Sequence, residues 1–124
     1  MLDKKIAIII GDIKTSAELN DSKTAQKIWE ALPIKGSAST WGDEIYFSIP
    51  VKVELENAKA VILKGDLGYW PPGSAFCIFF GPTPASQGNE IRPASPVNVF
   101  GKIIGDSKIF KKVRSGAKII IEKS

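Results

Sequence analysis

The sequence predicts a mainly β protein, a closed barrel of about eight short strands with two short helices. Short apolar or alternating runs recur along the chain, separated by turns that contain glycine or proline, as in antiparallel sheets. Only two segments show helical spacing. The chain has 124 residues, of which 44% are hydrophobic, enough for one domain with its own core. No linker divides the sequence, so residues 1–124 are predicted to form a single domain.

A hairpin and a helix are predicted first. Residues 4–11 and 13–18 are strand-like and meet at a Gly-Asp pair, which is typical of tight hairpin turns. A helix is predicted over residues 22–32, with capping oxygens before it and Pro33 as its stop. Its apolar residues follow helical spacing: Ala25, Ile28, Trp29 and Leu32.

The middle of the chain has a β pattern. Residues 44–49 are rich in strand formers, and residues 51–56 alternate apolar with charged side chains, as a half-exposed strand does. Residues 60–63 are a short apolar run before a turn. Residues 75–80 are almost wholly apolar and predict a buried strand.

A long loop precedes the last elements. Residues 81–96 contain four prolines and two glycines without periodicity, and a loop this long in a small domain is usually functional. We expect ordered segments on both sides of a mobile tip at residues 87–89. A strand over 97–104, a short helix over 107–114 and a strand over 117–122 follow. Four side chains should be well buried in the core: Trp29, Leu32, Phe100 and Phe110.

Composition excludes several kinds of chemistry. The sequence has no histidine and one cysteine, Cys77. An internal disulfide, a structural zinc site and Ser-His-Asp or Cys-His catalysis therefore lack the residues they need. Cys77 lies in an apolar run and is expected to be a small buried side chain in a reducing cytoplasm. No metal, cofactor or catalytic residue is predicted.

Charge and hydropathy bear on partners and location. The net charge is +4, and residues 99–124 hold seven basic against two acidic side chains. Nucleic-acid surfaces use basic stripes with interleaved aromatics, whereas this chain has only two arginines, so a lysine-rich solvated surface is the better expectation. The apolar run over residues 6–10 is too short to span a bilayer and does not resemble a signal peptide. We expect a cytoplasmic protein without a membrane partner.

Two sequence blocks resemble cyclophilins: Gly-Ser-Ala-Phe-Cys-Ile over residues 73–78, and Val-Phe-Gly-Lys-Ile-Ile-Gly over residues 99–105. Three further blocks resemble a small prokaryotic cyclophilin-like family, at residues 41–48, 65–73 and 98–103. This second resemblance spans nearly the whole chain. It implies a cyclophilin-like β-barrel.

The resemblance does not carry the isomerase activity with it. Cyclophilins use an arginine in a Phe-x-Arg-x-Ile-Pro motif, and Phe47 stands at that position here. Cys77 replaces an aromatic of the proline pocket, and Val97 replaces the histidine before Val-Phe-Gly. Arg92, on the long loop, is the arginine that could substitute. The resemblance therefore implies a barrel without the usual catalytic set.

A candidate groove is predicted between the long loop and aromatics near turns. The aromatics could stack on a ligand or simply cover the end of the barrel, and the polar groups could bind a carboxylate, amide or phosphate or simply be solvated. Asp43 and Glu44 should point to opposite faces of a strand, as a turn aspartate and a solvated glutamate. The candidate residues are Trp41, Phe47, Tyr69, Trp70, Arg92, Ser95 and Asn98.

Three functions remain open from the sequence. The first is a non-isomerase domain that binds a peptide or a small apolar ligand. The second is a weak prolyl isomerase that desolvates the amide and uses Arg92 or a backbone donor. The third is nucleic-acid binding through the basic segment 107–114. The sequence names neither the ligand nor the oligomeric state.

Overall fold

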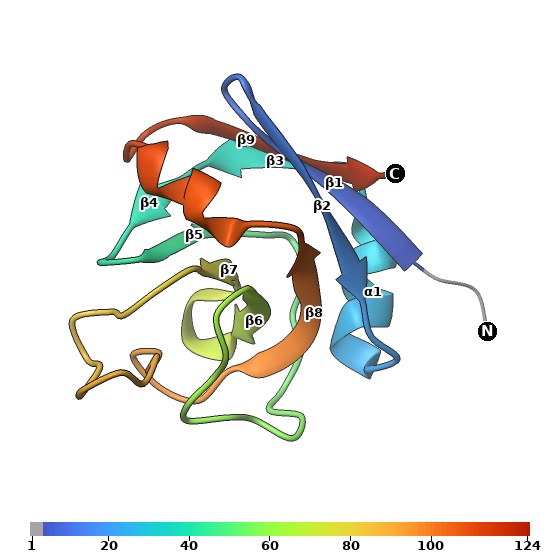
Figure 1. The fold of residues 1–124 in the computed structure, drawn as a ribbon. Coiled ribbons are helices and arrows are strands. Elements are labelled where there is room, and N and C mark those ends of the chain that lie inside the picture. The colour runs from blue at the N-terminus through green and yellow to red at the C-terminus, as the bar shows by residue number, and fades with distance from the viewer. Residues whose placement is uncertain (1–3) are drawn as a thin grey trace.

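The computed structural model describes residues 4–124 as one nine-stranded antiparallel sheet that curls into a nearly closed barrel (Figure 1). Its strand order is β3-β9-β1-β2-β8-β6-β7-β5-β4. The strands are β1 (Lys4–Ile10), β2 (Ile13–Leu19), β3 (Ile34–Ser37), β4 (Ser39–Thr40), β5 (Glu44–Ser48), β6 (Asp66–Trp70), β7 (Ala75–Phe79), β8 (Asn98–Ile104) and β9 (Lys118–Lys123). The predicted mainly β barrel is confirmed.

The chain itself connects the two edges of the sheet. β3 and β4 are the outermost strands in the sheet order, yet only Ala38 separates them in sequence. The backbone of Ala38 donates to the Ala117 carbonyl at 2.7 Å and accepts from the Gly116 N–H at 2.7 Å. These two bonds continue the β3–β9 pairing beyond Ser37, and the chain then passes directly into β4.

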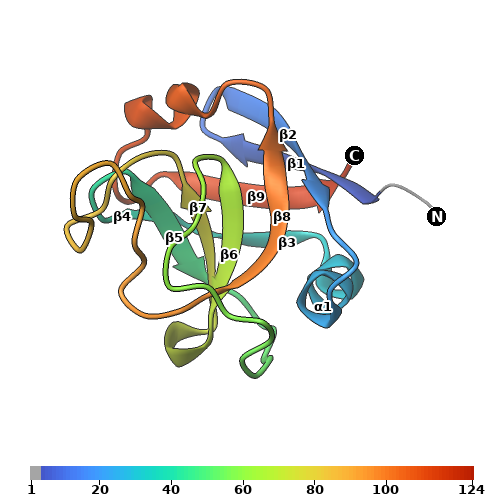
Figure 2. The ribbon, with the colours of Figure 1, turned by 60° about the horizontal axis from the view of Figure 1, so that its bottom comes forward.

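Two short helices lie on opposite sides of the barrel (Figure 2). α1 (Lys23–Ala31) begins at Ser22, whose side chain accepts from the Ala25 N–H, as N-cap serines do. The second helix, η2 (Ser107–Lys112), has 3-10 geometry and begins at Asp106. A single 3-10 turn, η1 (Pro71–Gly73), joins β6 to β7.

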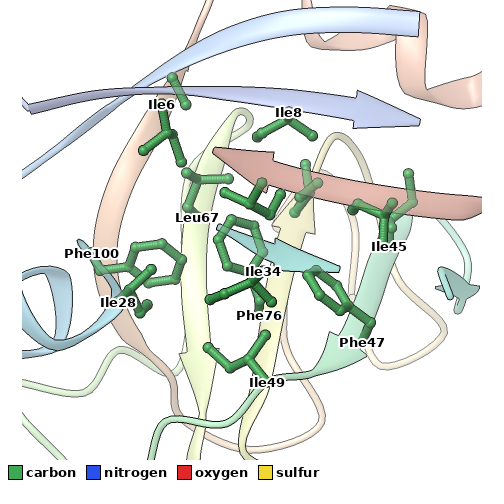
Figure 3. Close-up of a cluster of buried hydrophobic side chains, with 14 of the residues drawn as sticks. Ile6, Ile8, Ile28, Ile34, Ile45, Phe47, Ile49, Leu67, Phe76 and Phe100 are labelled. Carbon is green, nitrogen blue, oxygen red and sulfur yellow. The ribbon is translucent and has the colours of Figure 1, made fainter. Parts of the chain in front are cut away.

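The barrel interior holds the main core (Figure 3). Phe76 is fully buried there, with its ring centroid 5.5 Å from that of Phe47 and 5.0 Å from that of Phe100. Phe100 and Phe110 are buried as predicted. Trp29 and Leu32 are only partly buried, so the prediction for these two is wrong. Trp29 lies at the margin of the α1 interface, where Lys123 Nζ is 4.8 Å from its ring centroid.

A second, smaller hydrophobic cluster lies outside the barrel. It forms because β7 is buried on both faces: Phe76 and Ile78 point inward, whereas Cys77 and Phe79 point outward. The long loop over residues 81–96, hereafter the covering loop, packs on this outer face and contributes Ile91. The wholly apolar sequence of β7 follows from this double burial.

Residues 51–56 and 60–63 do not form strands, contrary to prediction. They belong to an irregular segment over residues 49–65, hereafter the linking segment, between β5 and β6. β6 already pairs with β7 and β8, and β5 with β4 and β7, so neither strand has a free edge for another. Residues 60–63 make one isolated bridge, from Ile62 to Ile91. Hydrogen bonds from side chains hold the linking segment in place of strand pairing. For example, Tyr69 Oη donates to the Val51 carbonyl at 2.6 Å.

Across residues 4–124, none of the helices is both long and apolar enough to cross a membrane.

Candidate functional site

A cavity of about 280 Å³ lies between the outer face of the barrel and the covering loop. β5, β6 and β7 form its floor, and the end of the covering loop forms one wall. The lining residues are Trp41, Glu44, Tyr46, Trp70, Cys77, Pro93, Ala94 and Val97. Two wider hollows of about 430 Å³ lie elsewhere on the surface. Neither of these is lined by an aromatic side chain or a buried ionisable group. We call the first space the outer cavity.

Strand alternation decides which side chains reach the outer cavity. Along β5, Ile45 and Phe47 point into the barrel, whereas Glu44 and Tyr46 point outward, because successive side chains alternate between faces. Tyr46 pairs directly with Cys77 of β7, which places both on the cavity floor. The floor is therefore built on rigid, hydrogen-bonded strands.

Two glycines make room for the cavity walls. Gly68 on β6 lies under Val97, and a Cβ there would come within 2.8 Å of Val97 Cγ2. Gly73 lies against the Trp70 ring, where a Cβ would come within 2.9 Å of Trp70 Cε3. Trp70 is held further by its indole Nε1, which donates to Ser95 Oγ at 2.6 Å. Contacts within the protein therefore fix the orientation of the Trp70 ring.

Trp41 stands at the turn between β4 and β5. The turn is closed by the Trp41 N–H, which donates to the Glu44 carbonyl at 2.9 Å, and Gly42 adopts a φ of +60°, a conformation that favours glycine. The Asp43 N–H donates to the Pro82 carbonyl at 3.0 Å. The turn is thereby attached to the start of the covering loop.

Glu44 is the buried acid of the outer cavity. It is only 6% exposed, and burial raises the pKa of its carboxyl from the ordinary 4.5 to about 7, although a hydrogen bond with the Cys77 thiol lowers it to a smaller extent. The ion pairs found within residues 4–124 join Arg92 to Glu90 and Lys111 to Asp43, so Glu44 has no cationic partner there. The prediction of a solvated glutamate is wrong, because the covering loop closes over this face of β5.

Cys77 lies beside Glu44 and is fully buried, as predicted. Burial, and then the charge of Glu44, raise the pKa of its thiol well above the ordinary value. A thiol in this environment stays protonated and is a poor nucleophile. Within residues 4–124, no group of three or more cysteine, aspartate or glutamate side chains is placed to hold a metal ion.

Comparison with known proteins places the chain in a family. The sequence pattern of the family described as cyclophilin-like matches residues 4–122. This chain belongs to the cyclophilin-like family. It is also similar to the solution structure of the hypothetical protein AF2241 from Archaeoglobus fulgidus. The two sequences are 41% identical, with 98% of this chain and 95% of that chain covered and a TM-score of 0.83. None of the curated proteins matches the sequence.

The outer cavity of this cyclophilin-like protein contains two of the seven residues predicted from sequence, Trp41 and Trp70. A third, Ser95, does not line the cavity, but its hydroxyl accepts a hydrogen bond from the Trp70 indole and so holds that ring in place. Phe47, at the sequence position of the cyclophilin arginine, is 4% exposed and packs against Phe76 inside the barrel. The prediction that Phe47 lines the groove is therefore wrong. The neighbouring side chain of Tyr46 points outward and lines the cavity instead.

Tyr69, Asn98 and Arg92 do not line the outer cavity either. Tyr69 points into the barrel, opposite to Trp70, and hydrogen-bonds the linking segment. Asn98 is 1% exposed and bonds to Thr24, Glu54 and Glu56. Arg92 Nε donates to Glu90 Oε2 at 2.6 Å, so its charge is paired within the covering loop.

The covering loop forms one wall of the cavity, in agreement with the sequence-based expectation. Pro93 and Ala94 supply this wall. Ser86 Oγ closes the loop on itself, because it accepts from the N–H groups of both Thr83 and Arg92 at 3.0 Å. Residues 87–89 are exposed beyond this closure, and their mobility stays a prediction.

Sequence reasoning missed the other lining residues: Glu44, Tyr46, Cys77, Pro93, Ala94 and Val97. For two of these the sequence carried a signal. Ile45, Phe47 and Ile49 are apolar at alternate positions, so they mark the inner face and place Glu44 and Tyr46 on the outer one.

Proposed function

We propose that this protein binds a small organic ligand, or the end of one peptide side chain, in the outer cavity, and does not catalyse prolyl isomerisation. The observation that carries the proposal is an aromatic-lined cavity with a single buried carboxyl, Glu44, on its floor. Binding sites are typically largely preformed, apolar, and equipped with a few placed polar groups. The strand-borne floor and the fixed ring of Trp70 match this description.

The size of the outer cavity limits its ligand. Its volume of about 280 Å³ is just below the range for small-molecule sites, roughly 300–1,000 Å³. A compact molecule or one side chain fits such a space, whereas an extended peptide would lie mainly outside it.

Chemical-shift mapping tests whether the cavity binds ligands. The isotope-labelled protein is titrated with a panel of small neutral, anionic and cationic organic molecules. We expect shifts of the Trp41 and Trp70 indole N–H signals, because these side chains line the cavity. The Trp29 indole, on α1, should stay unchanged and serves as an internal control.

A cavity-filling variant sharpens this test. Ala94 is exposed at the rim of the outer cavity, so Ala94→Trp should fill it without disturbing the barrel and abolish the shifts. Ala60→Trp is the matched control, because Ala60 is also exposed but does not line the cavity. Binding that persists in Ala94→Trp, or shifts confined to other surfaces, would contradict the proposal.

We also predict a prolyl isomerase rate at background. Positioned donors aimed at the developing charge usually supply the largest catalytic contribution, and Arg92 is instead paired with Glu90 outside the cavity lining. In a protease-coupled assay on a proline peptide, the wild-type protein and Arg92→Ala should therefore give the same rate as buffer. A rate clearly above buffer that falls in Arg92→Ala would favour the weak-isomerase alternative.

A further inference from the structure

We propose that the ligand of the outer cavity is a small organic cation, an N-alkylated ammonium group, held among Trp41, Tyr46 and Trp70 with the Glu44 carboxylate as its counter-charge. This inference rests on the proposed binding function and specifies its chemistry. It is argued from the aromatic rings, the charges around the cavity and the hydrogen-bonding capacity of its walls.

Three aromatic side chains from different positions in the fold line one small space. Trp41 comes from the turn before β5, Tyr46 from β5 itself and Trp70 from the end of β6. The faces of aromatic rings attract cations, tryptophan most strongly, and clusters of such rings are a common means of recognising quaternary ammonium groups. Two of the three rings here are tryptophans.

The charges around the outer cavity favour a cation. Among residues 4–124, the titratable groups that line it are Glu44 and Tyr46 from β5 and Cys77 from β7. β6 and the covering loop contribute only uncharged side chains to the lining, namely Trp70, Pro93 and Ala94. Lysine and arginine are absent from this lining. The Glu44 carboxylate has no cationic partner among residues 4–124, and a cationic ligand would supply one.

The walls distinguish an alkylated ammonium from a primary one. A primary ammonium carries three N–H donors that need acceptors. The cavity instead offers mostly apolar or aromatic side chains, with Cys77, Pro93, Ala94 and Val97 among them. A quaternary ammonium needs no hydrogen bonds, and its methyl groups can contact these walls directly. The site therefore suits a trimethylammonium group better than a free lysine or an arginine.

The same chemistry occurs in free metabolites and in methylated lysine side chains, so two cationic probes are used. Choline represents the free molecule, and an acetylated, amidated trimethyllysine represents the side chain. The neutral comparison is 3,3-dimethylbutan-1-ol, which has the shape of choline without its charge. Tighter binding of either cation than of the neutral analogue supports the proposal. Whichever cation binds more tightly shows whether the ligand is a free molecule or a methylated lysine side chain.

The titration is carried out at pH 8.5, where Glu44 is ionised, and followed on the Trp41 and Trp70 indole signals. We expect choline to bind at least about tenfold more tightly than its neutral analogue, because only the cation is attracted by the aromatic faces and by the ionised Glu44 carboxylate. Glu44→Gln should bind choline severalfold more weakly, because it removes the carboxylate and keeps the rings, and should bind the neutral analogue about as well as the wild type. Glu18→Gln is the matched control, because Glu18 is an exposed strand residue on β2.

The pH dependence gives a second readout. The affinity of the wild type for choline should rise between pH 6 and pH 8.5, because the Glu44 carboxyl ionises with a pKa of about 7. The affinity of Glu44→Gln should not change with pH. Equal binding of choline and its neutral analogue would overturn the cation proposal while leaving the proposed binding function intact. If no probe of any charge shifts the cavity signals, the proposed function itself fails.

Discussion

Replacing Glu44 with glutamine is expected to raise the free energy of unfolding by about 3 kcal/mol at pH 8.5 and to change it little at pH 4. Burial raises the pKa of the native carboxyl from 4.5 to about 7, and each pKa unit corresponds to about 1.4 kcal/mol. A glutamine keeps the shape of the protonated side chain without its charge. The variant therefore removes the cost of ionising a buried acid.

The direction of the pH effect follows from proton binding. Between pH 4.5 and about 7 the native Glu44 holds its proton while the unfolded one has lost it. The native state then binds more protons, so stability falls as pH rises through this window and the penalty is complete above it. The advantage of Glu44→Gln should appear over the same window.

Urea unfolding at pH 4, 5.5, 7 and 8.5 measures this effect, with Glu18→Gln as the exposed control. Burial raises the pKa of Asp66, and hydrogen bonds from Lys23 and Thr24 lower that of Glu56. Both groups are present in every variant, so the difference between Glu44→Gln and wild type isolates Glu44. A difference that is constant with pH, or that shrinks as pH rises, would show that Glu44 is ionised freely in the folded state.

The elements predicted correctly from sequence are those with local signals. β1 contains a continuous apolar run, β2 alternates apolar with polar residues, and a Gly-Asp turn in which Gly11 adopts a φ of +60° joins them. β7 is apolar throughout and α1 begins at a serine cap. Residues 51–56 show an equally good alternating pattern, yet they pair with no strand. Pairing depends on which strand edges are free, and this is a property of the whole sheet that no local pattern contains.

The candidate site was predictable only in part for the same reason. Trp41 and Trp70 were found because aromatics beside turns often line surface hollows, and Trp70 does so while its neighbour Tyr69 is buried inside the barrel. The wall made by Pro93 and Ala94 lies close to Glu44 only through the fold of the covering loop. A glutamate beside a turn looks solvated until the segment that buries it is known.

Asn98 shows how a polar residue next to a functional loop can be structural. It is 1% exposed, and its Oδ1 accepts from the Glu56 N–H at 2.8 Å. Its Nδ2 donates to the Glu54 carbonyl at 2.8 Å and to Thr24 Oγ1 at 3.1 Å. The Glu56 carboxylate in turn accepts from the backbone N–H groups that begin α1. One side chain thus connects β8, the linking segment and α1.

We expect Asn98→Ala to lower the free energy of unfolding by about 3 kcal/mol, because it removes three hydrogen bonds and leaves their partners partly unsatisfied, each at a cost of about 1 kcal/mol or more. Asn89→Ala is the matched control, since Asn89 is exposed on the covering loop, and it should leave stability within about 0.5 kcal/mol of wild type. Urea unfolding of both variants gives the comparison.

Hydrogen exchange then tests whether the loss arises from this network. In Asn98→Ala the Glu56 amide, and the Lys23 and Thr24 amides at the start of α1, should exchange faster than the change in global stability requires. The amides of β1, which β2 separates from β8 in the sheet order, should follow global stability alone. If stability and exchange are unchanged while ligand binding at the outer cavity is lost, Asn98 acts as the ligand contact that the sequence suggested, and its structural role is refuted.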